Sequence, residues 1–257
     1  MRRSILLAQF LAVVVAAVPA LAQETGKDAG KDTGKDTVNV ASGVLSRCAG
    51  RAGLEARRSD SAFGIIALDG RPWLTIEQTD DSVGSQAIAS TVTGIGELRR
   101  RNGTSLPFRF TCVFDAQGQA LMFHATPLMR RLGDVLPPAI VIEGVATYRE
   151  KMTLPHGIEL RVQLLDVAKV LPGAPPGAPG GEVLAEQVVR SGWQVPIPFA
   201  LRLPKETSFE GRRLVMTARL VLAHQVLFEL REPLAVVGTD LLKPIELVLD
   251  KAAAAKN

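Results

Sequence analysis

The chain has 257 residues, of which 47% are hydrophobic and 22% are charged, and its formal net charge is +4. This length and composition allow a buried core and two modest domains. The small positive charge, with no basic patch interleaved with aromatic residues, argues against nucleic acid as a partner.

The N-terminal 22 residues have the pattern of a secretory signal peptide. Arg2 and Arg3 precede an apolar run over residues 5–18, and Ala20-Leu21-Ala22 offers the small-x-small pattern that signal peptidase cleaves. We therefore expect export to the periplasm, with cleavage after Ala22. The run is shorter than the roughly 20 apolar residues that span a bilayer, so we expect no transmembrane anchor in the mature form. Loss of the two arginines leaves a formal charge of +2.

Two further features complete this N-terminal prediction. Bacterial lipoproteins carry their acylated cysteine directly after the apolar run, whereas the first cysteine here is Cys48, so no lipid anchor is expected. Residues 23–37 contain three Gly-Lys-Asp repeats with nothing to bury, which predicts a disordered linker.

Residues 38–126 are predicted to form a small α+β domain. Val44, Leu45 and Cys48 have helical spacing, which predicts an amphipathic helix within residues 40–58. Short runs typical of β-strands follow, at residues 65–68, 73–78, 90–99, 107–114 and 120–124. The last two would form a hairpin across residues 115–118. One helix on an antiparallel sheet fits this order.

Cys48 and Cys112 are the chain's two cysteines. An even count in an exported protein predicts one disulfide, which would tie the helix to the strand at residues 107–114. A catalytic redox pair is the alternative, but that chemistry usually uses closely spaced cysteines such as Cys-x-x-Cys.

Residues 127–138 end in two prolines and are predicted to connect the first domain to a second, at residues 139–250. In the second domain Ile158, Leu160 and Val162 alternate with Glu159 and Arg161, which predicts a strand with one face in a core and one in water. Other β runs lie at residues 142–149, 183–189, 195–203, 214–222, 226–230, 234–237 and 245–249. The pattern predicts an antiparallel β-sandwich of seven or eight strands. Residues 172–181 should form an exposed loop, and residues 251–257 a disordered tail.

The second region also resembles the YbaY/YscW family of bacterial envelope lipoproteins over residues 140–237. The matching residues are Gly144, Tyr148-Arg149, Leu154-Pro155-x-Gly157, Leu164-Leu165-Asp166-Val167, Leu184-Ala185-Glu186-Gln187, Val195-Pro196-Ile197-Pro198-Phe199 and Ala218-Arg219-Leu220. The resemblance implies a β-sandwich in the cell envelope and, for the YscW branch, a pilotin that helps a type III secretion secretin reach the outer membrane. The chain departs from the family in lacking the lipidation cysteine and in its added N-terminal region, which we assign to no named family.

Candidate functional residues are few. Tyr148 and Arg149 lie on a predicted edge strand, where a partner strand could add, although the sequence favours Tyr148 as a partly buried sandwich residue. His124, His156 and His224 have no carboxylate or cysteine at ligand spacing, so no metal site is predicted. No nucleophile beside a base and no cofactor motif appears, so we name no catalytic or cofactor-binding residue.

The sequence thus predicts an exported envelope protein of binding or assembly type, not an enzyme, with a secretin-like partner implied by the resemblance alone. The alternative is an envelope hydrolase or sugar-modifying enzyme, which would need paired carboxylates or an activated serine in a cleft.

Overall fold

The computed structural model describes residues 35–59, 63–129, 133–150, 152–168, 181–191, 195–237, 241 and 243–253, with the side chains of the helix described from residue 43 onward. These residues lie in one compact unit, residues 34–257. The predicted signal peptide, most of the Gly-Lys-Asp linker, most of the loop at residues 172–181 and most of the tail lie outside the described residues.

The described chain is mainly β with a single α-helix, as the sequence predicted. The elements are α1 (Lys35–Ser59), β1 (Phe63–Asp69), β2 (Thr75–Val83), β3 (Gln86–Arg100), β4 (Ser105–Phe114), β5 (Ala120–Pro127), β6 (Ala139–Tyr148), β7 (Glu159–Asp166), β8 (Glu182–Ser191), β9 (Ile197–Pro204), β10 (Leu214–Leu222), β11 (Gln225–Glu229), β12 (Leu234–Val236) and β13 (Ile245–Lys251). Each strand overlaps a β run predicted from the sequence.

The helix forms because its apolar residues recur at the helical period. Leu45, Cys48, Ala49 and Ala52 are almost completely buried on one face. In the last turn of α1, basic residues interact favourably with the helix dipole.

The strands form one hydrogen-bonded path in the order β5-β4-β3-β1-β8-β7-β10-β11-β13-β6-β9, with β2 paired to β3 and β12 to β10. All described ladders are antiparallel except the one between β6 and β13, which is parallel. The predicted antiparallel sandwich therefore contains one parallel pair. The sequence did not predict this pair, because alternation of apolar and polar residues does not indicate strand direction.

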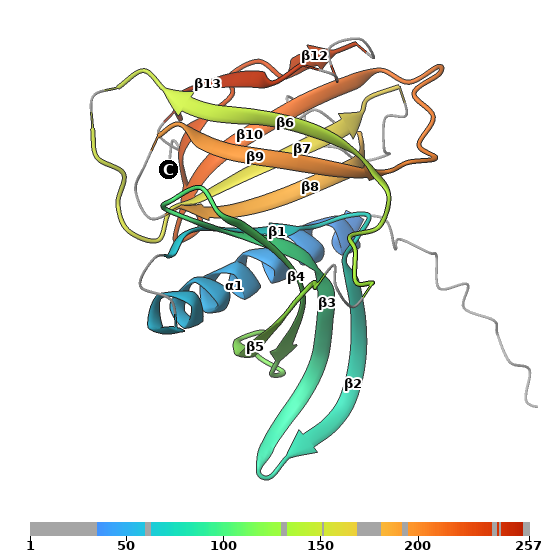
Figure 1. Cartoon of the computed structure of the whole chain (residues 1–257), viewed down its shortest axis with the longest axis vertical. Helices are drawn as coiled ribbons and strands as arrows, with labels where there is room; N and C mark the ends of the chain where they lie inside the picture. Colours follow the sequence, from blue (N-terminus) through green and yellow to red (C-terminus); the bar gives the residue numbers. More distant parts are fainter. Residues whose placement is uncertain are drawn as a thin grey trace, which may run out of the picture. The chain divides into compact units, whose positions relative to one another are not determined.

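The larger core lies between two layers of the second region. Figure 1 shows β6, β9 and β13 in front of β7, β8 and β10. The apolar side chains of both layers meet in this core, with Ile142, Leu160 and Leu201 fully buried. The apolar residues that alternate along β7 therefore face this core, as predicted.

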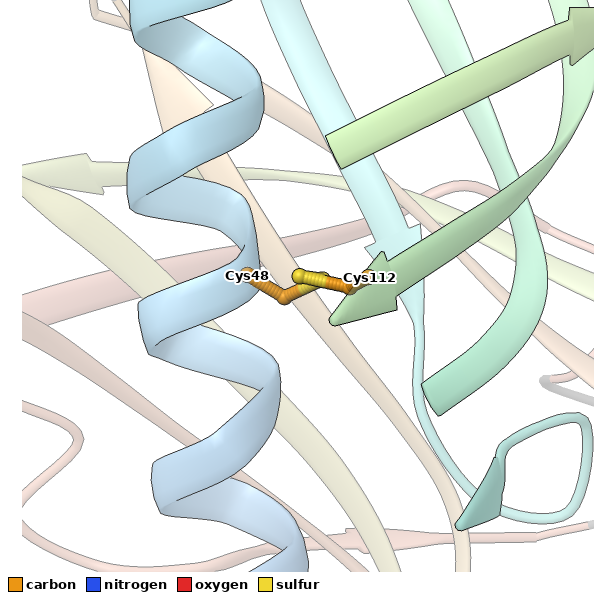
Figure 2. Close-up of a disulfide and its surroundings, with 2 residues drawn as sticks. All are labelled: Cys48 and Cys112. Atoms are coloured by element: carbon orange, nitrogen blue, oxygen red, sulfur yellow. A yellow bond between two sulfur atoms is a disulfide. The ribbon is translucent and has the colours of Figure 1, made fainter. Parts of the chain in front are cut away.

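A second core lies beneath α1. The helix packs on β1, β5 and β8, and buried side chains of β3 and β4 complete the core (Figure 1). Cys48 of α1 and Cys112 of β4 form the predicted disulfide, with Cα atoms 6.0 Å apart (Figure 2). It closes a loop of 64 residues, which in the chain-entropy picture stabilises the fold by about 4 kcal/mol.

Strand β8 is shared by the two cores, because Val188 faces the core under α1 and Val189 faces the larger core. Strand β1 pairs with β8 over five residues, so a continuous sheet joins the two predicted regions. The division at residues 127–138 into separate domains stays a prediction.

The polar face of β7 was predicted to face water, and this prediction is wrong. Glu159 is only 9% exposed, because α1 covers this face of the sheet. Ser46 of α1 donates a hydrogen bond to Glu159 Oε2 at 2.6 Å and accepts one from Arg161. Glu159 is therefore buried with partners, and Arg161 beside it is only partly exposed.

Candidate binding sites

The predicted partner site at Tyr148 and Arg149 lies at the end of β6. The expectation that β6 is an open edge is wrong, since Gly144 pairs with Phe199 of β9 on one side and Ile245 of β13 on the other. The tail strand β13 pairs with β6 over residues 245–249 and with β11 only at residues 250 and 251.

Tyr148 forms part of the wall of the larger core. Its ring stacks on Phe228 with centroids 4.8 Å apart, and its hydroxyl donates to the Met152 carbonyl. Burial raises the pKa of Tyr148 above its ordinary value. Arg149 beside it is exposed. Partner binding at these two residues stays a prediction, to be tested without the edge-strand argument.

A buried polar network lies where β8 passes beside β9. No backbone ladder joins β8 to β9 among the described strands; instead the Gln187 amide pairs with Ala200, donating to its carbonyl and accepting from its N–H, both at 2.9 Å. Gln187 also donates to Asp69 Oδ1 at 2.7 Å. The side chain of Gln187 thus satisfies two backbone groups of β9, the strand at the end of the hydrogen-bonded path.

Asp69 is the most perturbed acid of the described residues. Burial raises its pKa to about 7, although the hydrogen bond from Gln187 and the charge of Arg202, 3.3 Å away, both act to lower it. Desolvation therefore outweighs these favourable partners. The adjacent cavity, lined in part by Glu97 and Gln187, has a volume of about 10 Å³, which is room for about one water molecule.

A larger cavity, of about 490 Å³, lies between α1 and the turn that precedes β7. Its charged residues are Arg47, Arg51, Arg57 and Arg190. Sequence reasoning did not find this cavity. The spacing of Arg47 and Arg51 places both on one side of a helix, but nothing in the sequence brings Arg190 of β8 to them.

The three histidines lie on different parts of the fold. His156 lines the larger cavity, His224 lies in the turn between β10 and β11, and His124 lies on β5. Within the described ranges no three His, Cys, Asp or Glu side chains are grouped as metal ligands. The described part of the chain likewise contains no helix with the length and hydropathy that a bilayer crossing requires.

Several residues that carry the family resemblance have structural roles. Asp166 is 1% exposed and accepts hydrogen bonds from the backbone N–H groups of Ala168 and Arg213. Gly144 leaves no room for a side chain, because an added Cβ would lie 2.3 Å from the Ile245 carbonyl oxygen.

The second region is a two-layered β structure of the kind the resemblance implied, and comparison with known families agrees. Residues 137–243 match the family model of the type III secretion system lipoprotein chaperone YscW, which confirms the resemblance; the N-terminal region lies outside the match. A solved structure of an alternative pilotin from the type II secretion system of Vibrio cholerae is 25% identical, covering 44% of this chain and 97% of that chain with a TM-score of 0.37. No curated protein matches the chain.

Proposed function

We propose that this protein is exported to the periplasm and acts there as a chaperone-type binding or assembly factor for another envelope protein. The observation that carries the proposal is the match of residues 137–243 to a secretion-system chaperone family. A partner of the secretin class follows from that resemblance. The protein acts by binding and not by catalysis.

Two further observations support the address. The sequence before residue 23 has the features of a cleaved signal peptide. The disulfide between Cys48 and Cys112 is of the type that persists in oxidising compartments. Because the lipidation cysteine is missing, the protein acts without the lipid anchor of its relatives.

Cell fractionation and N-terminal sequencing test the address. We expect the mature chain in the periplasmic fraction, beginning at Gln23 and with Cys48 bonded to Cys112 in non-reducing peptide mapping. Recovery from the cytoplasm with Met1 retained would refute export, and with it the envelope function.

Affinity capture from the periplasm and outer-membrane fractions tests the partner. We expect the wild type to recover an envelope protein of the secretin class. Arg149→Ala and Tyr148→Phe examine the predicted site without removing the ring that stacks on Phe228. Arg231→Ala, a side chain 76% exposed, is the control.

The outcomes separate the site from the function. Weaker recovery with the variants at residues 148 and 149, but not with Arg231→Ala, would support the predicted site. Equal recovery by all forms would refute the site and leave the chaperone proposal intact. Failure of the wild type to retain any envelope protein would count against the chaperone proposal itself.

A further inference from the structure

The cavity beside α1 is lined by four arginines and no carboxylate. Arg47, Arg51 and Arg57 come from α1, and Arg190 comes from β8. The other lining residues are Gly50, Leu54, Ala120, His156 and Gly157. We call this site the arginine cleft. Arg47, Leu54, Arg57 and His156 are exposed, so the cleft is open to solvent.

Nearby carboxylates balance only part of this charge. Glu55 pairs with Arg51 at 3.0 Å, and Glu159 lies 3.7 Å from Arg190. Glu159 is also engaged by Ser46 and lies 3.7 Å from Arg161, so its charge is shared. Within the described part of the chain, no carboxylate lies at ion-pair distance from Arg47 or Arg57. The cleft therefore keeps an excess of positive charge.

Arg190 is held in place before any ligand arrives. Its Nη2 donates to the Gly157 carbonyl at 2.9 Å, and its guanidinium lies against Gly50 of α1. An added Cβ at Gly50 would lie 2.6 Å from Arg190 Nη1, so the glycine leaves the space that the guanidinium fills. Burial, together with the like charge of Arg57, lowers the pKa of Arg190, although Glu159 opposes this shift. Such crowding of cations is relieved when an anion binds.

The geometry favours one class of anion. A planar carboxylate is satisfied by one guanidinium fork, whereas a tetrahedral phosphate presents oxygens in several directions and accepts from several guanidinium groups at once. Four arginines that line one cavity from two elements, α1 and β8, match the second case. The volume of the cleft falls within the range of small-molecule sites, so the cleft has room for a ligand larger than a single phosphate ion. Leu54, 51% exposed at the wall, offers apolar contact to an organic group.

We propose that the arginine cleft is a binding site for phosphate-bearing ligands. Three of the four arginines lie outside residues 137–243, which match the chaperone family, so that match does not by itself account for the cleft. The phosphate belongs either to a free phosphate ester or to a phospholipid headgroup.

The test is titration calorimetry of the mature chain with pyrophosphate, and flotation with vesicles containing phosphatidic acid. The main variant is the double substitution Arg47→Gln/Arg57→Gln, which removes two charges that have no ion-pair partner among the described residues. The control is Arg219→Gln/Arg231→Gln, which removes the same charge from side chains 53% and 76% exposed that do not line the cleft. Thermal unfolding verifies that each variant is folded.

We expect the cleft variant to weaken phosphate binding about tenfold or more, and the control to leave it within about twofold. Gly50→Ala should also weaken binding, because it displaces Arg190 without changing the charge. Binding of pyrophosphate without binding of vesicles places the source among free phosphate compounds, and binding of vesicles places it in a lipid headgroup.

Four results would overturn the proposal, and the first three concern the wild type and the cleft variant. These are no binding of either probe, equal binding by the cleft variant and the wild type, and stronger binding of citrate, a polycarboxylate, than of pyrophosphate. A weakening of the same size in the control variant would show only a general charge effect and would also overturn it.

Discussion

Asp69 is the residue whose environment has the largest effect on its chemistry. Two partners stabilise its charged form, yet burial dominates and raises its pKa from 3.8 to about 7. The carboxyl group therefore changes its charge near neutral pH, inside a polar network that includes Gln187 and Arg202.

This pKa predicts that stability depends on pH. Between pH 4 and 7 the folded state binds a proton at Asp69 that the unfolded chain has released, so the free energy of unfolding falls as pH rises through this window and is level above it. The loss is at most about 4 kcal/mol. Urea titrations at pH 4, 5.5, 7 and 8 measure it. Asp69→Asn should flatten the profile, and Asp250→Asn, at a more exposed carboxylate, should not.

An unchanged slope in Asp69→Asn would assign the pH dependence to other groups. Equal stability of the wild type at pH 4 and pH 8 would contradict the raised pKa directly.

Among the elements, the hairpin of β10 and β11 has an unusual turn. Leu222 pairs with Gln225, so Ala223 and His224 form a two-residue loop, and their φ angles are 45° and 74°. Glycine adopts this left-handed region at little cost, whereas other residues are strained there.

We therefore expect His224→Gly to raise the free energy of unfolding by about 1 kcal/mol, because it removes strain from the turn. His124→Gly is the matched control, since His124 is exposed on β5 and has no left-handed φ. There glycine should lower the free energy of unfolding by roughly 0.5–1 kcal/mol. Chemical denaturation of both variants gives the comparison, and a loss of stability in His224→Gly would contradict the strained turn.

The close packing of β6 against β13 gives a second prediction about the elements. At Gly144 an added Cβ would lie 2.3 Å from the Ile245 carbonyl oxygen and 2.4 Å from the Phe199 ring. Gly144→Ala should therefore force β6 away from β13 and lower the free energy of unfolding by about 1–3 kcal/mol or more.

Glu143→Ala is the control for this change, because Glu143 is exposed on the same strand. Thermal unfolding of both variants distinguishes overpacking from a general effect on β6. A Gly144→Ala protein as stable as the wild type would show that β6 and β13 are not packed this closely.

The elements themselves were largely predictable from the sequence, and their environments were not. Alternation in β7 correctly placed Leu160 and Val162 in a core. It also identified Glu159 and Arg161 as a polar face, but alternation does not distinguish a wet polar face from one covered by another polar surface. Here Ser46, on a helix more than a hundred residues away in the sequence, supplies the cover.

For the whole molecule, the contact of α1 with β7 connects the two predicted regions. Ser46 is 7% exposed and bridges Glu159 and Arg161. Ser46→Ala should leave both charged groups short of a partner and lower the free energy of unfolding by about 1–3 kcal/mol. Ser59→Ala is the control, because its hydroxyl bonds to the Glu55 carbonyl at an exposed position.

Denaturant titration of both serine variants provides the measurement. If Ser46→Ala is as stable as Ser59→Ala, the polar contact between α1 and the sheet contributes nothing to folding, and the covered face of β7 would behave as the solvated face that the sequence first suggested.

The candidate sites were harder to predict than the elements, because they depend on residues brought together from distant segments. Cys48 and Cys112 were predictable as a pair because the chain has no other cysteine. Arg190 could not be assigned to α1 without the fold, since no spacing rule relates β8 to the helix. Tyr148 was correctly placed on a strand, but the two neighbours of that strand depend on pairings that alternation does not specify.

The position of β13 has a consequence for how the chain is completed. It is the last described strand in the sequence, yet it lies between β6 and β11. Because the N-terminus of a chain is synthesised first, one edge of β6 stays unpaired until β13, which ends at residue 251, has been made. Such an edge is a template for association with other chains, so aggregation competes with folding during this interval. The nascent chain is therefore prone to aggregation through β6 until β13 has been made.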